Sequence, residues 1–449
     1  MLSASLNDIA AMLGVAPPSS DVLCNGVSTD TRSLAAGNLF VALNGPKFRG
    51  ADFVQAARER GAVAALVDTL QQVDMPQLLV RDTRQALQHL ARAWRAMMTP
   101  LLIGITGSNG KTTMRSMIAA CCPDNTLATQ GNLNNDIGVP LTLLRLSEQH
   151  RFAVIEMGAN AVGDIKLLAD IAKPAIGIVT NAGPAHLEGF GSLQGVADGK
   201  GELFSALGAD DTAIINRDDT YYAQWREMAA PATVMTFGST PAADVWFDDL
   251  RIAEHIEFAL HVGDDVQQVA LRLGGEHNAY NACGALAVAL AAGLPLDESV
   301  ARLSAVEAEP GRQRSRIGRH GGAVIDDSYN ANPASMRASA AAAVAAHDDV
   351  YMVIGDMGEL GDDAIQMHAD LGAQLRDIGV SQLFAFGPLA AHAAAAFGPQ
   401  AMATQSLDEL IAALQTSLNA GTAVIVKGSR SMRMERIVDL LCATKQECH

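Results

Sequence analysis

A seven-residue segment between an apolar run and a helical pattern has the composition of a phosphate-binding loop. It follows residues 101–106 and consists of Gly107, Ser108, Asn109, Gly110, Lys111, Thr112 and Thr113. Glycines allow backbone N–H groups to turn toward phosphate oxygens, and the helix N-terminus adds partial positive charge. Lys111 is placed to reach the β- and γ-phosphates, and Thr112 to bind Mg²⁺. Ile105 occupies the usual position of the first glycine of this motif. The strand, the GKTT segment and the helix nevertheless follow one another in the usual order and spacing.

Two further side chains are placed to serve the same site. Glu156 lies near the end of the apolar run 152–157, and His186 follows the run 175–180. Ligands of parallel sheets gather at the carboxyl ends of the strands, and a carboxylate there is a natural Mg²⁺ ligand. Each residue alone is more often a rim or structural residue. Their parallel placement downstream of the phosphate loop favours a shared site.

Other polar residues have both a structural and a functional interpretation. Asn278 and Asn281 open a helix, where they either cap it or bind adenine. Arg312 follows Pro310-Gly311 at a boundary, where it is either a phosphate clamp or a linker charge. The polar segment 326–333 follows a buried strand and indicates a small-molecule site. The segments 355–361 and 427–435 occupy the same predicted edge.

The apolar segments that must position these residues predict three α/β units. Residues 1–98 mix short strands with two helices. Residues 99–310 alternate apolar runs with helices, which predicts a central phosphate-loop ATPase domain with a doubly wound, mostly parallel sheet and an antiparallel excursion at 232–275. Residues 311–449 contain four more buried-type strands separated by helices, which predicts a C-terminal Rossmann-like domain.

Composition excludes several classes of function. The 449-residue chain has a net charge of -17 and 4% aromatic residues, without a basic patch, so nucleic-acid binding is disfavoured. We identify neither a signal peptide nor an apolar run of the ~18 residues that a membrane span requires. The six cysteines are scattered, as expected for reduced thiols in a cytoplasmic protein.

Nine segments, in this order along nearly the whole chain, resemble the Mur ligases of peptidoglycan synthesis. They are STDTR, ITGSNGKTT, GNLNNDIGVP, VIEMGAN, AHLEGFGS, GEHNAYNA, DDSYNANPASM, GDMGELG and KGSRSM. GNLNNDIGVP, DDSYNAN and GDMGELG are the specific ones, whereas GKTT alone fits many NTPases. The resemblance is strongest to the member of the family that adds D-Ala-D-Ala, and the D-N-P-R motif of the diaminopimelate- or lysine-adding ligase does not occur.

The resemblance implies an ATP- and Mg²⁺-dependent amide ligase. It would join D-Ala-D-Ala to UDP-N-acetylmuramoyl-tripeptide through an acyl phosphate, most simply as a monomer. The N-terminal domain would bind the UDP end, the central domain ATP and the C-terminal domain the dipeptide. Closure of the domains would exclude water from the acyl phosphate.

The resemblance also implies residue roles. Catalysis would use Lys111, Glu156, His186 and Lys200, while Mg²⁺ would be held by Thr112, Glu156, His186 and a carbamylated Lys200. Besides the phosphate loop, ATP would contact Asn278, Asn281, Arg312 and Asp327. The substrates would contact Ser28, Arg32, Asn134, Asn135, Tyr329, Asn330 and Asn332. Lys200 enters through the resemblance alone, because a helical lysine is ordinarily a solvated charge.

Three alternatives remain open from the sequence. A phosphate-loop switch or motor would hydrolyse ATP without needing a carboxylate or an amine, but it leaves the third unit unexplained. A non-catalytic UDP-sugar-binding module is disfavoured by GKTT together with Glu156 and His186. A sister amide ligase, such as a folate-polyglutamate synthetase, is disfavoured by STDTR and GNLNNDIGVP.

Overall fold

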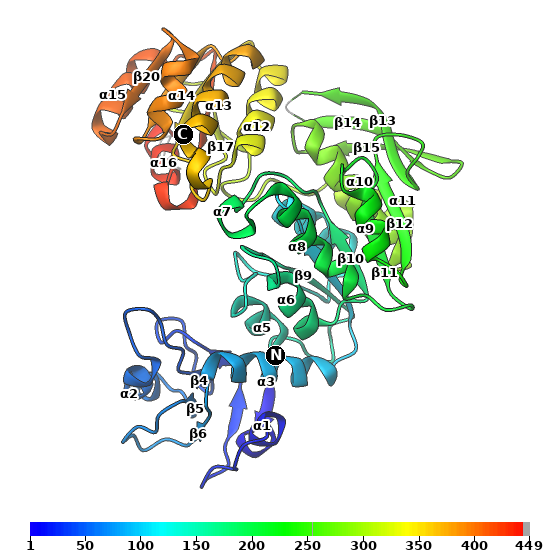
Figure 1. Cartoon of the computed structure of the whole chain (residues 1–449), viewed down its shortest axis with the longest axis vertical. Coiled ribbons are helices and arrows are strands. Elements are labelled where there is room, and N and C mark those ends of the chain that lie inside the picture. The colour runs from blue at the N-terminus through cyan, green and yellow to red at the C-terminus, as the bar shows by residue number, and fades with distance from the viewer. Residues whose placement is uncertain (254, 443–449) are drawn as a thin grey trace.

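The computed structural model describes residues 1–253 and 255–442 and arranges them in three α/β units (Figure 1). The unit that contains the N-terminus lies at the bottom of the view, the central unit in the middle and right, and the C-terminal unit at the upper left. Each unit has its own main sheet, of four, nine and six strands respectively. The predicted fold class, α/β with large sheets dominated by parallel strands, is confirmed.

The N-terminal unit is built on a four-stranded parallel sheet of order β3-β4-β5-β6. Its strands are β3 (Val27–Ser28), β4 (Leu39–Val41), β5 (Ala64–Val67) and β6 (Gln77–Leu79), and its helices include α2 (Val54–Glu59) and α3 (Thr83–Ala96). The Asp82 carboxylate caps α3, which buries Leu87, Leu90 and Trp94 along one face. An antiparallel pair, β1 (Ser3–Ser5) and β2 (Leu23–Asn25), flanks α1 (Leu6–Leu13) and was not predicted.

The nine-stranded central sheet has the order β15-β14-β13-β12-β11-β10-β7-β9-β8. Its parallel strands are β7 (Leu101–Thr106), β8 (Thr126–Ala128), β9 (Phe152–Glu156), β10 (Ile176–Val179), β11 (Thr212–Asn216) and β12 (Thr233–Gly238). The antiparallel part is β13 (Val245–Ile252), β14 (Ile256–Val262) and β15 (Asp265–Leu271). The predicted antiparallel segment 232–275 was wrong at its start, because β12 is parallel to β11 and joins β13 by a short parallel pairing.

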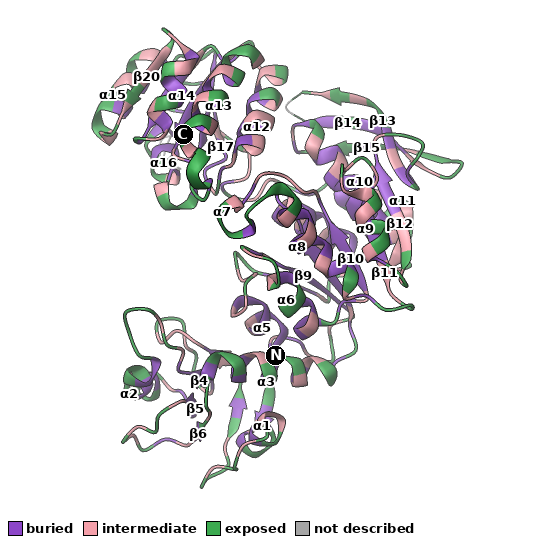
Figure 2. Ribbon diagram, viewed as in Figure 1, coloured by how far each residue is buried: buried purple, intermediate pink, exposed green. Residues whose placement is uncertain are grey.

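Helices cover both faces of this sheet, and the strands lie buried between them (Figure 2). One face packs against α4 (Lys111–Cys121) and α10 (Glu276–Ala291), and the other against α6 (Asp164–Ala172) and α8 (Leu193–Ser205). The remaining helices are α5 (Gly138–Leu143), α7 (Leu187–Phe190), α9 (Tyr222–Met228) and α11 (Leu296–Leu303). Double-sided burial explains why these strands are continuous apolar runs rather than alternating ones.

The C-terminal unit has the sheet order β16-β17-β21-β18-β19-β20, in which only β16 is antiparallel. Its strands are β16 (Arg314–Ile317), β17 (Ala323–Asp326), β18 (Asp349–Gly355), β19 (Gln382–Phe386), β20 (Ala401–Thr404) and β21 (Thr422–Lys427). Its helices are α12 (Pro333–Ala346), α13 (Ala364–Ile378), α14 (Ala390–Phe397), α15 (Leu407–Ser417) and α16 (Glu435–Leu441). Neither β16 nor β20 was predicted. Among the described residues, no helix is both long and apolar enough to cross a membrane.

Trp225 anchors α9 against α8, the helix that carries Lys200. Its side chain is fully buried, its indole N–H donates to the Ala197 carbonyl at 3.0 Å, and its ring packs on Phe204 at 6.0 Å. The packing of Trp225 therefore determines where α8 lies on the sheet.

We expect Trp225→Ala to lower the free energy of unfolding by about 3–5 kcal/mol, because it leaves a large cavity and an unpaired Ala197 carbonyl. Urea unfolding followed by circular dichroism measures this loss. Trp246→Ala is the matched control, since that ring lies in the excursion, partly exposed and stacked on His261. A loss for Trp225→Ala no larger than that of the control would contradict the packing argument.

Candidate active site

The phosphate loop is held in place by the residues that follow β10. Gly107 has a φ of 145°, and a Cβ at this position would lie 1.8 Å from Thr180 Oγ1, so only glycine fits. Thr180 Oγ1 donates to the Asn109 carbonyl at 2.6 Å. Ser108 Oγ donates to the Gly183 carbonyl and accepts from the Gly183 N–H, both at 2.9 Å. The loop is thus fixed before any ligand binds.

Helix α4 begins at Lys111, directly after Gly110 in the left-handed conformation. The first N–H groups of a helix have no intrahelical partners and carry partial positive charge, which suits them to bind phosphate. The Lys111 ammonium folds back and donates to the carbonyls of Gly107 at 2.6 Å and Ser108 at 3.3 Å. Burial lowers the pKa of Lys111 to about 8, an effect that Glu156 opposes and Arg312 reinforces.

Glu156 ends β9 as a carboxylate that is 2% exposed. Its Oε1 accepts from Asn134 Nδ2 at 2.8 Å. Its Oε2 is buried and, among the described residues, has no hydrogen-bond partner, because Arg115 Nη1 lies 3.6 Å away. An unpaired buried carboxylate oxygen is costly unless something binds it, and Mg²⁺ prefers such hard oxygen ligands.

Arg115 is a functional residue that the sequence did not reveal. It lies one turn after Lys111 on α4 and is 4% exposed. Its guanidinium contacts Glu156, donates to Glu309 at 2.5 Å and donates to the Gly131 carbonyl at 3.2 Å. It therefore holds the Glu156 carboxylate in place and ties α4 to the joint before the C-terminal unit. Its spacing from Lys111 is the only sequence signal that could have found it.

His186 lies before α7 in the left-handed conformation, with a φ of 54°. Its Nδ1 contacts the Glu359 carboxylate of the C-terminal unit. Burial lowers the pKa of His186, Glu359 opposes that shift, and Lys111 and Lys200 add to it. His186 thus joins the central site to the GDMGELG segment. Among the described residues, no cluster of three or more His, Cys, Asp or Glu side chains is arranged to hold a metal ion.

Lys200 lies on α8 and is 1% exposed. Its Nζ is 3.5 Å from the Ala159 carbonyl and 5.1 Å from the centre of the Phe190 ring. Burial, with a further contribution from Lys111, holds the pKa of Lys200 well below its usual range. Within the described chain, no carboxylate forms an ion pair with this amine. A buried lysine in such surroundings favours its neutral form.

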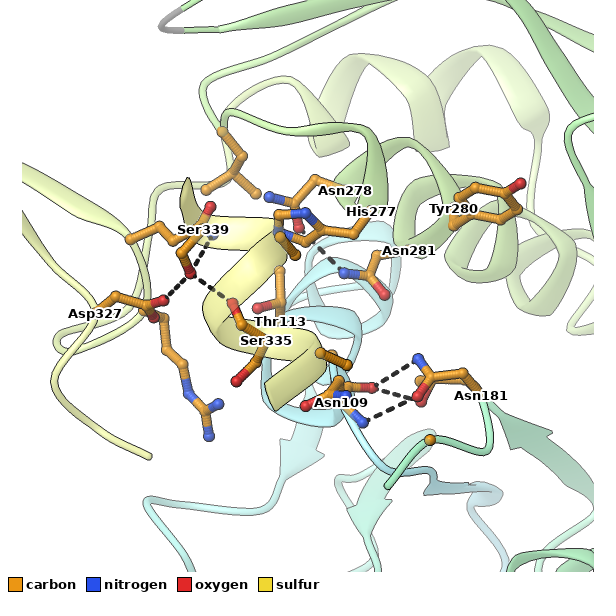
Figure 3. Close-up of a pocket in the computed structure, with 18 of the residues that line it drawn as sticks. Asn109, Thr113, Asn181, His277, Asn278, Tyr280, Asn281, Asp327, Ser335 and Ser339 are labelled. Carbon is orange, nitrogen blue, oxygen red and sulfur yellow. Dashed lines mark hydrogen bonds between the residues drawn. The ribbon is translucent and has the colours of Figure 1, made fainter. Parts of the chain in front are cut away.

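Two cavities meet at the phosphate loop. The first, of about 490 Å³, is lined by Asn109, Asn181, His277, Asn278, Asn281, Asp327 and Ser339 (Figure 3), among others. The second, of about 600 Å³, is lined by Lys111, Thr112, Asn134, Asn135, Glu156, His186, Tyr329, Asn330 and Asn332, among others. Both are bordered by Asn109, Gly110, Arg312, Ser335 and Lys427. A nucleotide can therefore lie in the first cavity with its phosphates reaching the second.

The amides of the first cavity form a short hydrogen-bonded chain on α10. Asn278 Nδ2 donates to the Gly274 carbonyl at 2.8 Å, and Asn281 Nδ2 donates to Asn278 Oδ1 at 3.1 Å. Opposite them, α12 of the C-terminal unit closes the cavity (Figure 3). Asp327 accepts from Lys427 Nζ at 2.7 Å, and this pair is buried. Burial lowers the pKa of Lys427 and Asp327 raises it.

Two hydrogen bonds connect the C-terminal unit directly to the phosphate loop. Arg312 Nη2 donates to Thr112 Oγ1 at 3.2 Å. Asn332 Nδ2 donates to Asn109 Oδ1 at 2.8 Å, while its own Oδ1 caps α12. The guanidinium of Arg312 lies 4.1 Å from the Tyr329 ring centre. The loop is therefore shared between two units of the fold.

Most of the residues selected from the sequence lie at these two cavities. Ser28 and Arg32 do not, because they lie in the N-terminal unit, where Ser28 Oγ donates to the Asp30 carbonyl at 3.0 Å and Arg32 pairs with Asp30 at 2.6 Å. Lys200 lies behind the wall formed by Ala159 rather than on the surface of the second cavity. Asn135 lines the cavity but also accepts from the Gly138 N–H at 2.8 Å, which begins α5. The roles assigned to these residues remain predictions.

The chain is similar to known protein families and to individual proteins along nearly its whole length. Three family patterns match it: "Mur ligase family, catalytic domain" over residues 24–95, "Mur ligase middle domain" over 105–289 and "Mur ligase, glutamate ligase domain" over 311–430. UDP-N-acetylmuramoyl-tripeptide–D-alanyl-D-alanine ligase of Escherichia coli (strain K12) is 38% identical over 453 residues, covering 98% of this chain and 99% of that protein.

Solved structures agree. A crystal structure of MurF from Acinetobacter baumannii has a TM-score of 0.89 at 33% identity and covers 98% of this chain and 99% of that one. MurF ligase from Thermotoga maritima in complex with ADP has a TM-score of 0.83 at 26% identity, with 93% and 96% covered. The fold and the site thus define a phosphate-loop nucleotide-binding protein with a shared interdomain site. The chain belongs to the Mur ligase family.

We expect Gly107→Ala to abolish ADP binding, because the added methyl group collides with Thr180 Oγ1 and displaces the loop. Isothermal titration calorimetry measures the affinity. The control is Gly163→Ala, which also changes a glycine with positive φ but places its Cβ where no atom lies within 4 Å. ADP binding by Gly107→Ala at the level of this control would show that the loop geometry is not required.

We also expect Mg²⁺-free ADP binding to weaken as pH rises above about 8. Phosphate attracts the protonated form of Lys111, whose pKa in the free protein is about 8, below its ordinary 10.5. Above that pH the neutral Lys111 amine must take up a proton on binding, so affinity falls by up to about tenfold per pH unit. Calorimetry from pH 7 to 9.5 on wild type and Lys111→Ala tests this expectation. Parallel profiles for the two proteins would contradict it.

Proposed function

We propose that the protein is an ATP-dependent amide ligase that joins D-Ala-D-Ala to UDP-N-acetylmuramoyl-tripeptide, forming ADP and phosphate in peptidoglycan precursor synthesis. The observation that carries this proposal is the pairing of a phosphate loop with a second, polar cavity at the joint of two units. An ATPase switch needs only the first cavity. A ligase needs both, because the carboxylate and the amine must meet beside the γ-phosphoryl group.

The second cavity offers the groups that this chemistry needs. In the first step, a carboxylate oxygen of the tripeptide attacks the γ-phosphorus, and the bond to the β-phosphate oxygen breaks to give an acyl phosphate and ADP. Lys111 and Arg312 would balance the charge on the transferred group. In the second step, the dipeptide amine attacks the acyl carbon, phosphate leaves and the amine loses its proton. The chain's contribution is mainly positioning and charge stabilisation.

Magnesium fits the oxygen donors of this cavity. Glu156 Oε2 has no hydrogen bond within the described structure, only an ion pair with Arg115 at 3.6 Å, and the Thr112 hydroxyl borders the same cavity. His186 borders the cavity, and a carbamylated Lys200 would add a hard oxygen ligand. The metal, when bound, would neutralise charge on phosphoryl and carboxylate oxygens.

The remaining assignments follow the same proposal. Asn278, Asn281 and Asp327 would contact the adenosine end of ATP in the first cavity. Asn134 and Asn135 would contact the sugar-peptide, and Tyr329, Asn330 and Asn332 the dipeptide. Ser28 and Arg32 would contact the uridine diphosphate, so the N-terminal unit (1–98) would serve that substrate, the central unit (99–310) ATP and the C-terminal unit (311–449) the amine. We place the reaction in the cytoplasm, in a monomer.

The deciding experiment measures phosphate release by the purified protein with ATP and Mg²⁺ and each combination of the two substrates. Release that requires both, with the pentapeptide product seen by mass spectrometry, supports the ligase. Release indifferent to both supports the switch. Release triggered by an amine such as L-glutamate, but not by D-Ala-D-Ala, supports a sister amide ligase. Lys111→Ala should abolish turnover with the fold intact, because its charge acts on phosphates; near-normal activity would contradict its role.

We expect Lys200→Ala to reduce turnover by at least about 100-fold, because a neutral lysine is suited to take up CO₂ and become a metal ligand. Added bicarbonate should raise wild-type turnover in CO₂-depleted buffer and leave the variant unchanged. Lys166→Ala, which removes an exposed lysine of α6, is the control. Full activity of Lys200→Ala without CO₂ would remove this lysine from the site.

A further inference from the structure

One cation of the second cavity has no part in the roles described above. Arg430 follows β21 and is an exposed residue that lines this cavity. Its guanidinium lies 5.8 Å from the centre of the Tyr329 ring, and its Nη1 donates to Glu435 at 3.1 Å. An arginine has five N–H donors, and within residues 1–253 and 255–442 only one hydrogen bond engages Arg430, so most of its guanidinium is available to a ligand.

The other cations of the cavity also have partners within the fold, and Arg84, like Arg430, has a single carboxylate partner. They are Lys111 with the Gly107 carbonyl, Arg312 with Thr112, Lys427 with Asp327, and Arg84 with Asp136. Lys111 and Arg312 also touch the phosphate loop, which suits them to phosphoryl oxygens. Arg430 belongs to the C-terminal unit, and its guanidinium lies near the same Tyr329 ring as that of Arg312.

Resting on the proposed function, we infer that Arg430 binds the C-terminal carboxylate of the incoming dipeptide. The amine of that dipeptide must reach the acyl phosphate beside Lys111, and an extended dipeptide places its carboxylate about 7 Å from its amine. The same cavity runs from Lys111 to Arg430. A planar guanidinium binds a carboxylate through two parallel hydrogen bonds, and the Tyr329 face restricts its orientation.

This assignment makes Arg430 a specificity-determining residue rather than a catalytic one. The carboxylate it would bind takes no part in the bond that forms. Removing the guanidinium should therefore weaken the dipeptide and leave phosphoryl transfer intact. The charge on the dipeptide's far end, rather than its size, would select it over amines that lack a free carboxylate.

The test compares D-Ala-D-Ala with its C-terminal amide as acceptors in the full-length protein. We expect wild type to prefer the acid by about 10- to 100-fold in kcat/KM, and Arg430→Ala to lose this preference through a higher KM for the acid. The KM values for ATP and UDP-N-acetylmuramoyl-tripeptide should not change. Arg430→Lys should recover part of the preference, since it restores the charge but not the fork. Arg436→Ala removes an exposed arginine that packs over Phe386 and is the control.

Arg430→Ala that keeps the wild-type preference for the acid would overturn the inference. So would a raised KM for the UDP-linked tripeptide with an unchanged KM for the dipeptide, because Arg430 would then serve the other substrate. A wild-type protein that makes no pentapeptide overturns the proposed function itself, and this inference with it. A wild-type protein that makes pentapeptide from acid and amide equally well overturns the inference alone.

Discussion

The architecture depends on a phosphate loop that two units of the fold hold from opposite sides. Thr180 binds the Asn109 carbonyl from within the central sheet, and Asn332 binds the Asn109 side chain from the N-terminus of α12. Arg312 adds a contact from the joint to Thr112. Because one loop carries all three contacts, the position of the C-terminal unit and the geometry of the nucleotide site are coupled. This coupling is what a reaction with three substrates in one place requires.

The cost of this arrangement is a concentration of buried charge. Glu156, Arg115, Lys200 and Lys427 are all less than 5% exposed, and they lie at or just behind the two cavities. Buried charges rarely stabilise a fold more than apolar groups of the same volume would. Lys427 and Asp327 compensate each other, whereas Lys200 has no such partner in the described chain and one oxygen of Glu156 has no hydrogen bond there. Incomplete pairing of this kind is expected where ligands complete the site.

The sequence was sufficient to predict those strands that are marked by an uninterrupted run of apolar residues. The run 101–106 became β7 with the same bounds, and the run 175–180 became β10 (Ile176–Val179), because strands buried on both faces are continuously apolar. Strand β16 is mostly exposed, and β1 and β20 have only three or four residues, so no apolar run marked them.

The candidate site likewise contains some residues that the sequence could identify and others that only the tertiary structure reveals. Lys111 and Thr112 follow from the loop motif, and Glu156 from its place at a strand end. Arg115 looks like any helical arginine until the fold places Glu309 beside it, from 194 positions further along the chain. Asn332 is recognisable as a helix cap, but its contact with Asn109 exists only because two units meet. Lys200 has no local signal, since its burial is produced entirely by tertiary packing.

The proposed mechanism requires that the shared loop transfers a phosphoryl group onto a carboxylate. The most direct measurement uses UDP-N-acetylmuramoyl-tripeptide whose terminal carboxylate carries ¹⁸O at both oxygens, with ATP, Mg²⁺ and D-Ala-D-Ala, and follows the label in the released phosphate by mass spectrometry. We expect each phosphate to carry one ¹⁸O, because the acyl phosphate breaks between carbon and oxygen. Phosphate free of label, formed in step with the pentapeptide, would contradict it.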